Sequence, residues 1–133
     1  MGLLAVCAAS CASGEDSGKS AQREAKRACA IATPGVGTGL TMAENLADAR
    51  QALSHARKAA KADKAWNKLR RAYAIMELSW KDMVAAAGPE WRFDDPQTPE
   101  HQARVKASFD RWGDRAGVAE KTITSQCQQL NET

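Results

Sequence analysis

Four cysteines are the residues of this 133-residue chain whose spacing says most about possible chemistry. Cys7 and Cys11 are separated by three residues, whereas Cys29 and Cys127 stand far apart in the sequence. Zinc sites that use cysteine pairs need tighter pairs, together with a second pair or with histidines at a regular spacing. Neither partner set accompanies Cys7 and Cys11, so we predict no metal site and no cofactor.

A second set of candidate metal or haem ligands consists of two histidines and three methionines: His55, His101, Met42, Met76 and Met83. The histidines are not paired four residues apart, and no CxxCH motif for haem attachment is present. We therefore expect these side chains to have structural roles.

The N-terminal stretch AASCASGED combines small residues, a cysteine and a polar segment. It resembles the processing site of bacterial lipoproteins, with Ala9 and Ser10 before Cys11 and Ala12 after it. The resemblance implies that Cys11 becomes the lipidated N-terminus of an exported, membrane-anchored protein. A secretory signal remnant without lipidation and an ordinary N-terminus are the alternatives.

This resemblance sets the expected domain organisation. We interpret residues 1–10 as a truncated signal-peptide remnant, residues 11–16 as a flexible tether and residues 17–133 as a single helical domain. An exported chain meets an oxidising environment, so Cys29 and Cys127 are expected to form a disulfide. Such a bond would close a loop of about 98 residues and stabilise the fold by about 4 kcal/mol on the chain-entropy model. Two buried free thiols are the alternative.

The alanine-rich composition favours helices, because alanine loses no side-chain entropy in a helix. Periodic alanines predict a first helix over residues 17–32, which the sequence TPGVGTG ends. Thr41 with Glu44 forms a capping-box pattern, and neither glycine nor proline follows until residues 88–89. Thr98 and Pro99 then predict the start of a last helix over residues 99–130.

The long segment over residues 41–87 can form one helix or two. Its apolar face changes direction near the sequence KADK, so the chain either breaks there, with Asp63 capping a second helix, or meets different neighbours along one rod. In a strict up-and-down bundle, a bond between Cys29 and Cys127 favours an odd number of rods. We therefore predict an all-α antiparallel bundle of three long helices with one disulfide, with four helices and a break near Lys61–Lys64 as the alternative.

The last helix has a regular apolar stripe: Val105, Phe109, Trp112, Ala116, Ala119, Ile123, Cys127 and Leu130. Two glycines, Gly113 and Gly117, interrupt it at a cost of about 1 kcal/mol each. We expect these glycines to allow close contact with a neighbouring helix near Trp112.

Basic residues cluster around the middle of the chain. Residues 57–71 include seven basic side chains and one acid, and five of the basic residues share one face of a continuous helix: Arg57, Lys61, Lys64, Lys68 and Arg71. A solvent-facing helix surface explains this pattern most simply. The functional interpretation is contact with an anionic envelope component such as lipid headgroups.

A proline-rich loop over residues 88–99 contains Trp91 and Phe93 among acidic residues. Such aromatics either cover the end of the bundle or form an exposed anchor for an unknown protein partner. The acids of the loop lack the ligand spacing of a calcium-binding loop.

No catalytic motif is visible in the sequence, and no nucleic-acid recognition motif accompanies the net charge of +3. We predict a non-enzymatic interaction or accessory module of the cell envelope, lipid-anchored at the extracytoplasmic face or secreted. The alternative is a small-ligand carrier with an apolar pocket among Trp66, Trp80 and Trp112.

Overall fold

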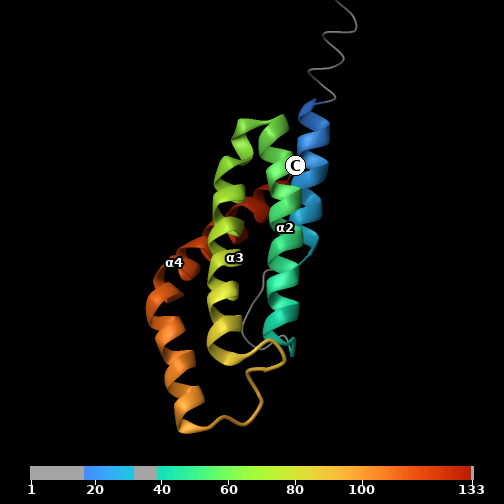
Figure 1. Ribbon diagram of the computed structural model, residues 1–133. Coiled ribbons are helices and arrows are strands. Elements are labelled where there is room, and N and C mark those ends of the chain that lie inside the picture. Colours follow the sequence, from blue (N-terminus) through green and yellow to red (C-terminus); the bar gives the residue numbers. More distant parts are fainter. Residues whose placement is uncertain (1–16, 32–38, 133) are drawn as a thin grey trace, which may run out of the picture.

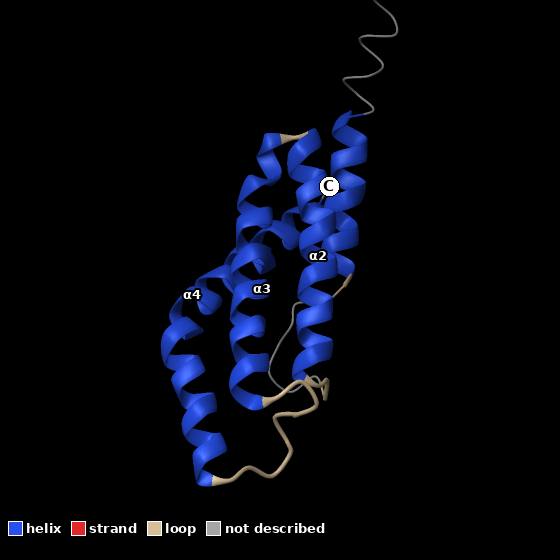
Figure 2. Ribbon diagram, viewed as in Figure 1, coloured by secondary structure: helices blue, strands red, loops and turns tan. Residues whose placement is uncertain are grey.

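The structure, a computed structural model, describes residues 17–31 and 39–132. These ranges contain helices and loops and no strand, which confirms the predicted all-α class (Figure 2). The helices are one over residues 17–30, α2 (Met42–Ala62), the short 3₁₀ helix η1 (Lys64–Trp66), α3 (Asn67–Ala87) and α4 (Pro99–Glu132).

The start of α2 has the predicted capping box. The Thr41 hydroxyl accepts a hydrogen bond from the Glu44 backbone N–H at 3.1 Å, and Glu44 Oε1 accepts one from the Thr41 N–H at 3.0 Å. These two bonds satisfy backbone donors that a helix N-terminus leaves without partners.

The prediction of one continuous helix over residues 41–87 is wrong, because α2 ends at Ala62 and α3 begins at Asn67. Asp63 between them is extended, and its carboxylate accepts a hydrogen bond from the Ala65 N–H at 3.0 Å, which starts η1. The apolar faces of the two halves point in different directions, so a straight rod could not bury both against one core. The turn near Lys61–Lys64 reverses the chain and lets both faces pack inward.

Helices α2 and α3 lie side by side and run in opposite directions, with η1 at one end of the molecule (Figure 1). α3 contacts both α2 and α4. The N-terminal helix lies along α2, and Glu24 of the former is hydrogen-bonded to His55 of the latter.

The predicted disulfide joins Cys29 and Cys127, whose Cα atoms are 5.8 Å apart. Residues 41–87 form two helices and the bond is still made, so the expectation from the sequence that it favours an odd number of rods is wrong. Figure 1 shows that α4 bends and that its C-terminal half crosses toward the N-terminal helix. The N-terminal helix is also short, so its end lies part-way along the bundle, where the crossing segment reaches it.

The core combines close-packed alanines with a few large side chains. The alanines come from the N-terminal helix, α2, α3 and α4, and they include Ala25, Ala28, Ala49, Ala52, Ala56, Ala59 and Ala119. The largest fully buried apolar side chains are Tyr73, Met42, Leu53, Leu69, Met76 and Ile123. The Tyr73 hydroxyl donates to the Ala28 carbonyl at 3.2 Å, and burial raises the pKa of Tyr73 to about 12. The Tyr73 hydroxyl thus links α3 to the N-terminal helix.

The predicted apolar stripe of α4 is only partly buried. Val105, Ile123 and Leu130 are buried, Trp112 is half-buried, and Phe109 is 44% exposed. Part of the apolar stripe of α4 therefore stays uncovered, and hollows lie between α3 and α4.

Candidate functional site

The predicted lipidation site Cys11 lies outside the described residues, as do Cys7 and the tether over residues 11–16. The first described residue is Ser17, and its helix begins at the same end of the molecule as η1 (Figure 1). The preceding chain therefore joins the bundle at the end where α2 turns into α3.

This end carries the predicted basic residues, which we call the basic end: Arg57, Lys61, Lys64, Lys68 and Arg71. All five are exposed. Because α2 stops at Ala62, they surround the turn and do not form one stripe along a continuous helix. Within the described part of the chain, none of them forms an ion pair with an acidic side chain. Their positive charge is therefore available to a partner.

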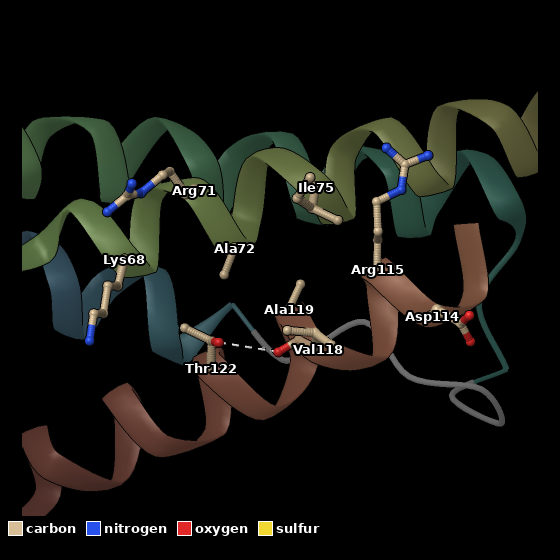
Figure 3. A pocket seen from close by; sticks show the side chains of 9 residues that line it. All are labelled: Lys68, Arg71, Ala72, Ile75, Asp114, Arg115, Val118, Ala119 and Thr122. Atoms are coloured by element: carbon tan, nitrogen blue, oxygen red, sulfur yellow. Dashed lines mark hydrogen bonds between the residues drawn. The ribbon is translucent and has the colours of Figure 1, made fainter. Parts of the chain in front are cut away.

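A groove of about 540 Å³ between α3 and α4 adjoins the basic end (Figure 3). Ala72 and Ile75 of α3 face Val118 and Ala119 of α4 across it. The remaining lining residues are polar or charged: Lys68, Arg71, Asp114, Arg115 and Thr122. The groove thus combines an apolar floor with a mainly cationic rim, and sequence reasoning missed it because it depends on how α4 crosses α3.

The loop over residues 88–98 closes the opposite end of the bundle. Its carbonyls at Pro89 and Trp91 each accept a hydrogen bond from the first backbone N–H groups of α2, both at 2.9 Å. His101 Nε2 donates to the Ala87 carbonyl at 2.7 Å, and Arg92 Nε donates to the Gly39 carbonyl at 3.0 Å. The loop therefore satisfies the N-terminus of α2, and His101 of α4 satisfies a carbonyl at the C-terminus of α3.

The aromatic side chains of this loop pack inward. Trp91 and Phe93 are half-buried, and their ring centres are 5.3 Å apart in an edge-to-face arrangement. The ring centres of Trp91 and His101 are 4.8 Å apart, and those of Phe93 and Phe109 are 6.1 Å apart. We call Trp91, Phe93, His101 and Phe109 the aromatic end. Of the two roles considered for Trp91 and Phe93, the structure shows the covering one, and contact with a partner stays a prediction.

The three tryptophans of the predicted ligand pocket do not come together. Trp80 and Trp112 line a cavity of about 180 Å³ between α3 and α4, together with methionines and phenylalanines, whereas Trp66 lies in η1 at the other end. Gly113 and Gly117 line this cavity as well. The expectation that they permit close helix contact is wrong, because an added Cβ at either position meets nothing within 4 Å. Their small size leaves the cavity open.

The two histidines take part in separate hydrogen bonds. His55 Nδ1 lies 2.6 Å from Glu24 Oε2, and this bond is the main reason why the pKa of Glu24 is lowered. His101 belongs to the aromatic end. Among residues 17–31 and 39–132, no group of three or more His, Cys, Asp or Glu side chains is placed to hold a metal ion.

Sequence reasoning also missed a polar link between α3 and α4. The buried Ser108 hydroxyl donates to Asp82 Oδ2 at 2.7 Å, and Arg111 donates to the same oxygen at 2.9 Å. The carboxylate thus holds the serine proton in a hydrogen bond and is itself neutralised by a guanidinium. This arrangement links α3 to α4.

Comparisons with models of protein families, with curated proteins and with solved structures found no match to this chain. In the part of the chain that the structure describes, none of the helices has the length and apolarity needed to span a bilayer. The functional conclusion therefore depends on the geometry of the chain itself.

Proposed function

We propose that this protein is an exported, lipid-anchored helical module of the cell envelope that acts by binding, with its basic end directed at an anionic membrane surface. The observation that carries the proposal is that the N-terminal helix begins at the same end of the molecule as the turn between α2 and α3, which the basic end surrounds (Figure 1). Six residue steps separate Cys11 from Ser17, and an extended chain spans at most about 3.5 Å per residue. A lipid on Cys11 would therefore hold the bundle within about 20 Å of the membrane.

The charge of the basic end adds to such an anchor. One acyl chain gives only marginal membrane binding, so stable attachment commonly needs a second signal such as a polybasic patch. Each Lys or Arg near an anionic surface contributes about 1 kcal/mol, and salt screens this attraction. The five exposed side chains of the basic end, without acidic partners of their own, fit this second role.

Export and anchoring are tested by intact mass and cell fractionation. The proposal predicts a modified chain that begins at Cys11 and is found in the membrane fraction. The variant Cys11→Ser is expected to leave that fraction, and Cys7→Ser serves as its matched control. A wild-type chain that keeps Met1 and is found in the soluble fraction would contradict the anchor.

The surface role is tested with the full chain carrying Cys11→Ser, so that no lipid is attached. It is expected to co-sediment with vesicles of phosphatidylglycerol and phosphatidylcholine and not with phosphatidylcholine alone. Lys61→Glu with Lys64→Glu should weaken this binding at least tenfold, because two cations at the basic end become anions. Lys81→Glu with Lys106→Glu makes the same change of charge away from that end and should have a smaller effect.

A small-ligand carrier is the second candidate function, favoured by the cavity that Trp80 and Trp112 line. Its volume of about 180 Å³ suits a ligand of roughly one ring, since an engineered apolar cavity of about 150 Å³ holds benzene. The carrier function predicts that apolar single-ring compounds change the tryptophan fluorescence and that Gly117→Leu, which fills the cavity, abolishes the change. An unaltered response in Gly117→Leu would contradict it.

A further inference from the structure

The groove between α3 and α4 exposes apolar surface beside positive charge. Val118 on its floor is 65% exposed, the most exposed of the large apolar side chains in the described ranges. Ile75 is half-buried across from it, and Ala72 and Ala119 close the floor beneath (Figure 3). Covering this surface would remove apolar area from water, which favours a ligand with an apolar part.

The rim of the groove selects the charge of that ligand. Three cations and one acid line it, namely Lys68, Arg71, Arg115 and Asp114. Arg71 donates through Nε to the Asn67 carbonyl at 3.4 Å, and its terminal N–H groups make no hydrogen bond within the described residues. Arg115 is held with its guanidinium carbon 4.0 Å from the centre of the Trp112 ring. The cations are thus positioned without being neutralised, and an anionic group complements them.

The size of the groove limits the occupant. Its volume of about 540 Å³ lies within the range of small-molecule sites. Lys68 and Ile75 are seven residues apart on α3, so the floor extends about 10 Å along that helix. An acidic amphipathic helix of three turns would be about 16 Å long and about 10 Å wide, and four apolar side chains could not cover its apolar face. A single hydrocarbon chain is much narrower than a helix, so these four side chains can cover one side of it.

We propose that the groove binds a lipid with one acyl chain and an anionic headgroup, the chain lying over Ile75 and Val118 and the headgroup meeting Lys68 and Arg71. The proposal rests on the proposed function for its source of lipid, because the groove begins at the basic end, which would face the membrane. It adds a site for an individual lipid molecule to a surface that contacts the membrane as a whole.

The test measures binding by titration calorimetry to the full chain carrying Cys11→Ser, with dodecyl phosphate kept below its micellar concentration. Two further probes separate the parts of the ligand: dodecyltrimethylammonium has the chain without the negative charge, and inorganic phosphate has the charge without the chain. We expect dodecyl phosphate to bind at least tenfold more tightly than either. Equal affinity for the ammonium compound, or for inorganic phosphate, would overturn the proposal.

Variants locate the site. Val118→Glu places an acid on the groove floor and should weaken dodecyl phosphate binding at least tenfold, whereas Leu78→Glu makes the same change at an exposed apolar residue of α3 outside the groove and should not. Arg71→Gln should weaken binding severalfold, and thermal melting confirms that each variant is folded. Equal binding by Val118→Glu and Leu78→Glu, or full affinity in Arg71→Gln, would overturn the assignment.

The two proposals fail separately. Lys61→Glu with Lys64→Glu alters the basic end outside the groove, so it should reduce vesicle binding and leave dodecyl phosphate binding intact. Val118→Glu should mainly do the reverse. If the chain binds vesicles but not dodecyl phosphate, only the proposal of the groove site is contradicted. If it binds dodecyl phosphate but not vesicles, only the proposal that the basic end faces the membrane is contradicted.

Discussion

The two ends of this bundle use their polar and charged groups differently. At the aromatic end, loop carbonyls, His101 and Arg92 are all engaged in hydrogen bonds that close the bundle. At the basic end, Asp63 caps η1, while the five exposed cations of that end have no acidic partner in the described structure. The comparison teaches that one end uses its polar groups to hold the fold together, whereas the other leaves its positive charge without acidic partners among the described residues.

The largest effect on stability is expected from the disulfide. It ties the N-terminal helix, and with it the entry of the chain at the basic end, to α4. Replacing Cys29 and Cys127 by serine should lower the free energy of unfolding by about 4 kcal/mol, because a loop of about 98 residues is no longer closed in the unfolded chain. Urea unfolding of wild type and variant measures the difference. A loss below about 1 kcal/mol would show that the other contacts of the N-terminal helix suffice.

A pair of variants tests the contrast between the ends directly. Phe93→Ala should cost about 2 kcal/mol, because a half-buried ring that packs on Trp80, Trp91 and Phe109 is lost. Lys61→Glu with Lys64→Glu should change stability by less than about 0.5 kcal/mol, since both side chains are exposed. Thermal unfolding of both variants gives the ranking, and the reverse order would contradict the view that the aromatic end stabilises the fold more than the basic end does.

A smaller effect, of opposite sign, is expected at the cavity between Trp80 and Trp112. Gly113→Ala and Gly117→Ala should each raise the free energy of unfolding by up to about 1 kcal/mol, because alanine is the better helix former and the added methyl group meets open space. Gly88→Ala is the contrasting control and should destabilise, since its φ of 97° disfavours a side chain. Destabilisation by both helical substitutions would mean that the bend of α4 needs the glycines.

The smallest effect concerns acid stability. The hydrogen bond from His55, with the nearby charge of Arg27, lowers the pKa of Glu24 below its ordinary value of 4.5. The stability that the Glu24 carboxylate contributes is therefore fully present above pH 4.5 and is lost as the pH falls through the lowered pKa. Glu24→Gln should flatten the pH dependence of unfolding below pH 4.5. An unchanged slope in this variant would assign the acid sensitivity to other carboxylates.

Local sequence signals predicted much of the fold because they act over a few residues. Thr41 and Glu44 form their capping box, Pro99 begins α4, and the pairing of Cys29 with Cys127 is confirmed. The prediction of one helix over residues 41–87 was wrong because it assumed a strict up-and-down bundle, in which all helices are straight and of similar length. The short N-terminal helix and the bend of α4 remove that premise.

The candidate sites were predicted less well than the elements, because they depend on distances between helices. The basic residues were identified, yet their arrangement around a turn required the break at Asp63. Trp80 and Trp112 share a cavity, and Trp66 lies away from it, since η1 is at the opposite end. No sequence pattern predicts the α3–α4 groove or the Ser108–Asp82 hydrogen bond, because each is formed by residues of two different helices.

The most direct test of the central claim is the salt dependence of binding between the Cys11→Ser chain and phosphatidylglycerol-containing vesicles. If the basic end faces an anionic membrane, binding should weaken steadily as salt rises, and Lys61→Glu with Lys64→Glu should reduce both the affinity and its salt dependence. The control Lys81→Glu with Lys106→Glu should keep most of both. Equal loss in the two double variants, or binding that does not respond to salt, would contradict the assignment of the basic end as the membrane-facing surface.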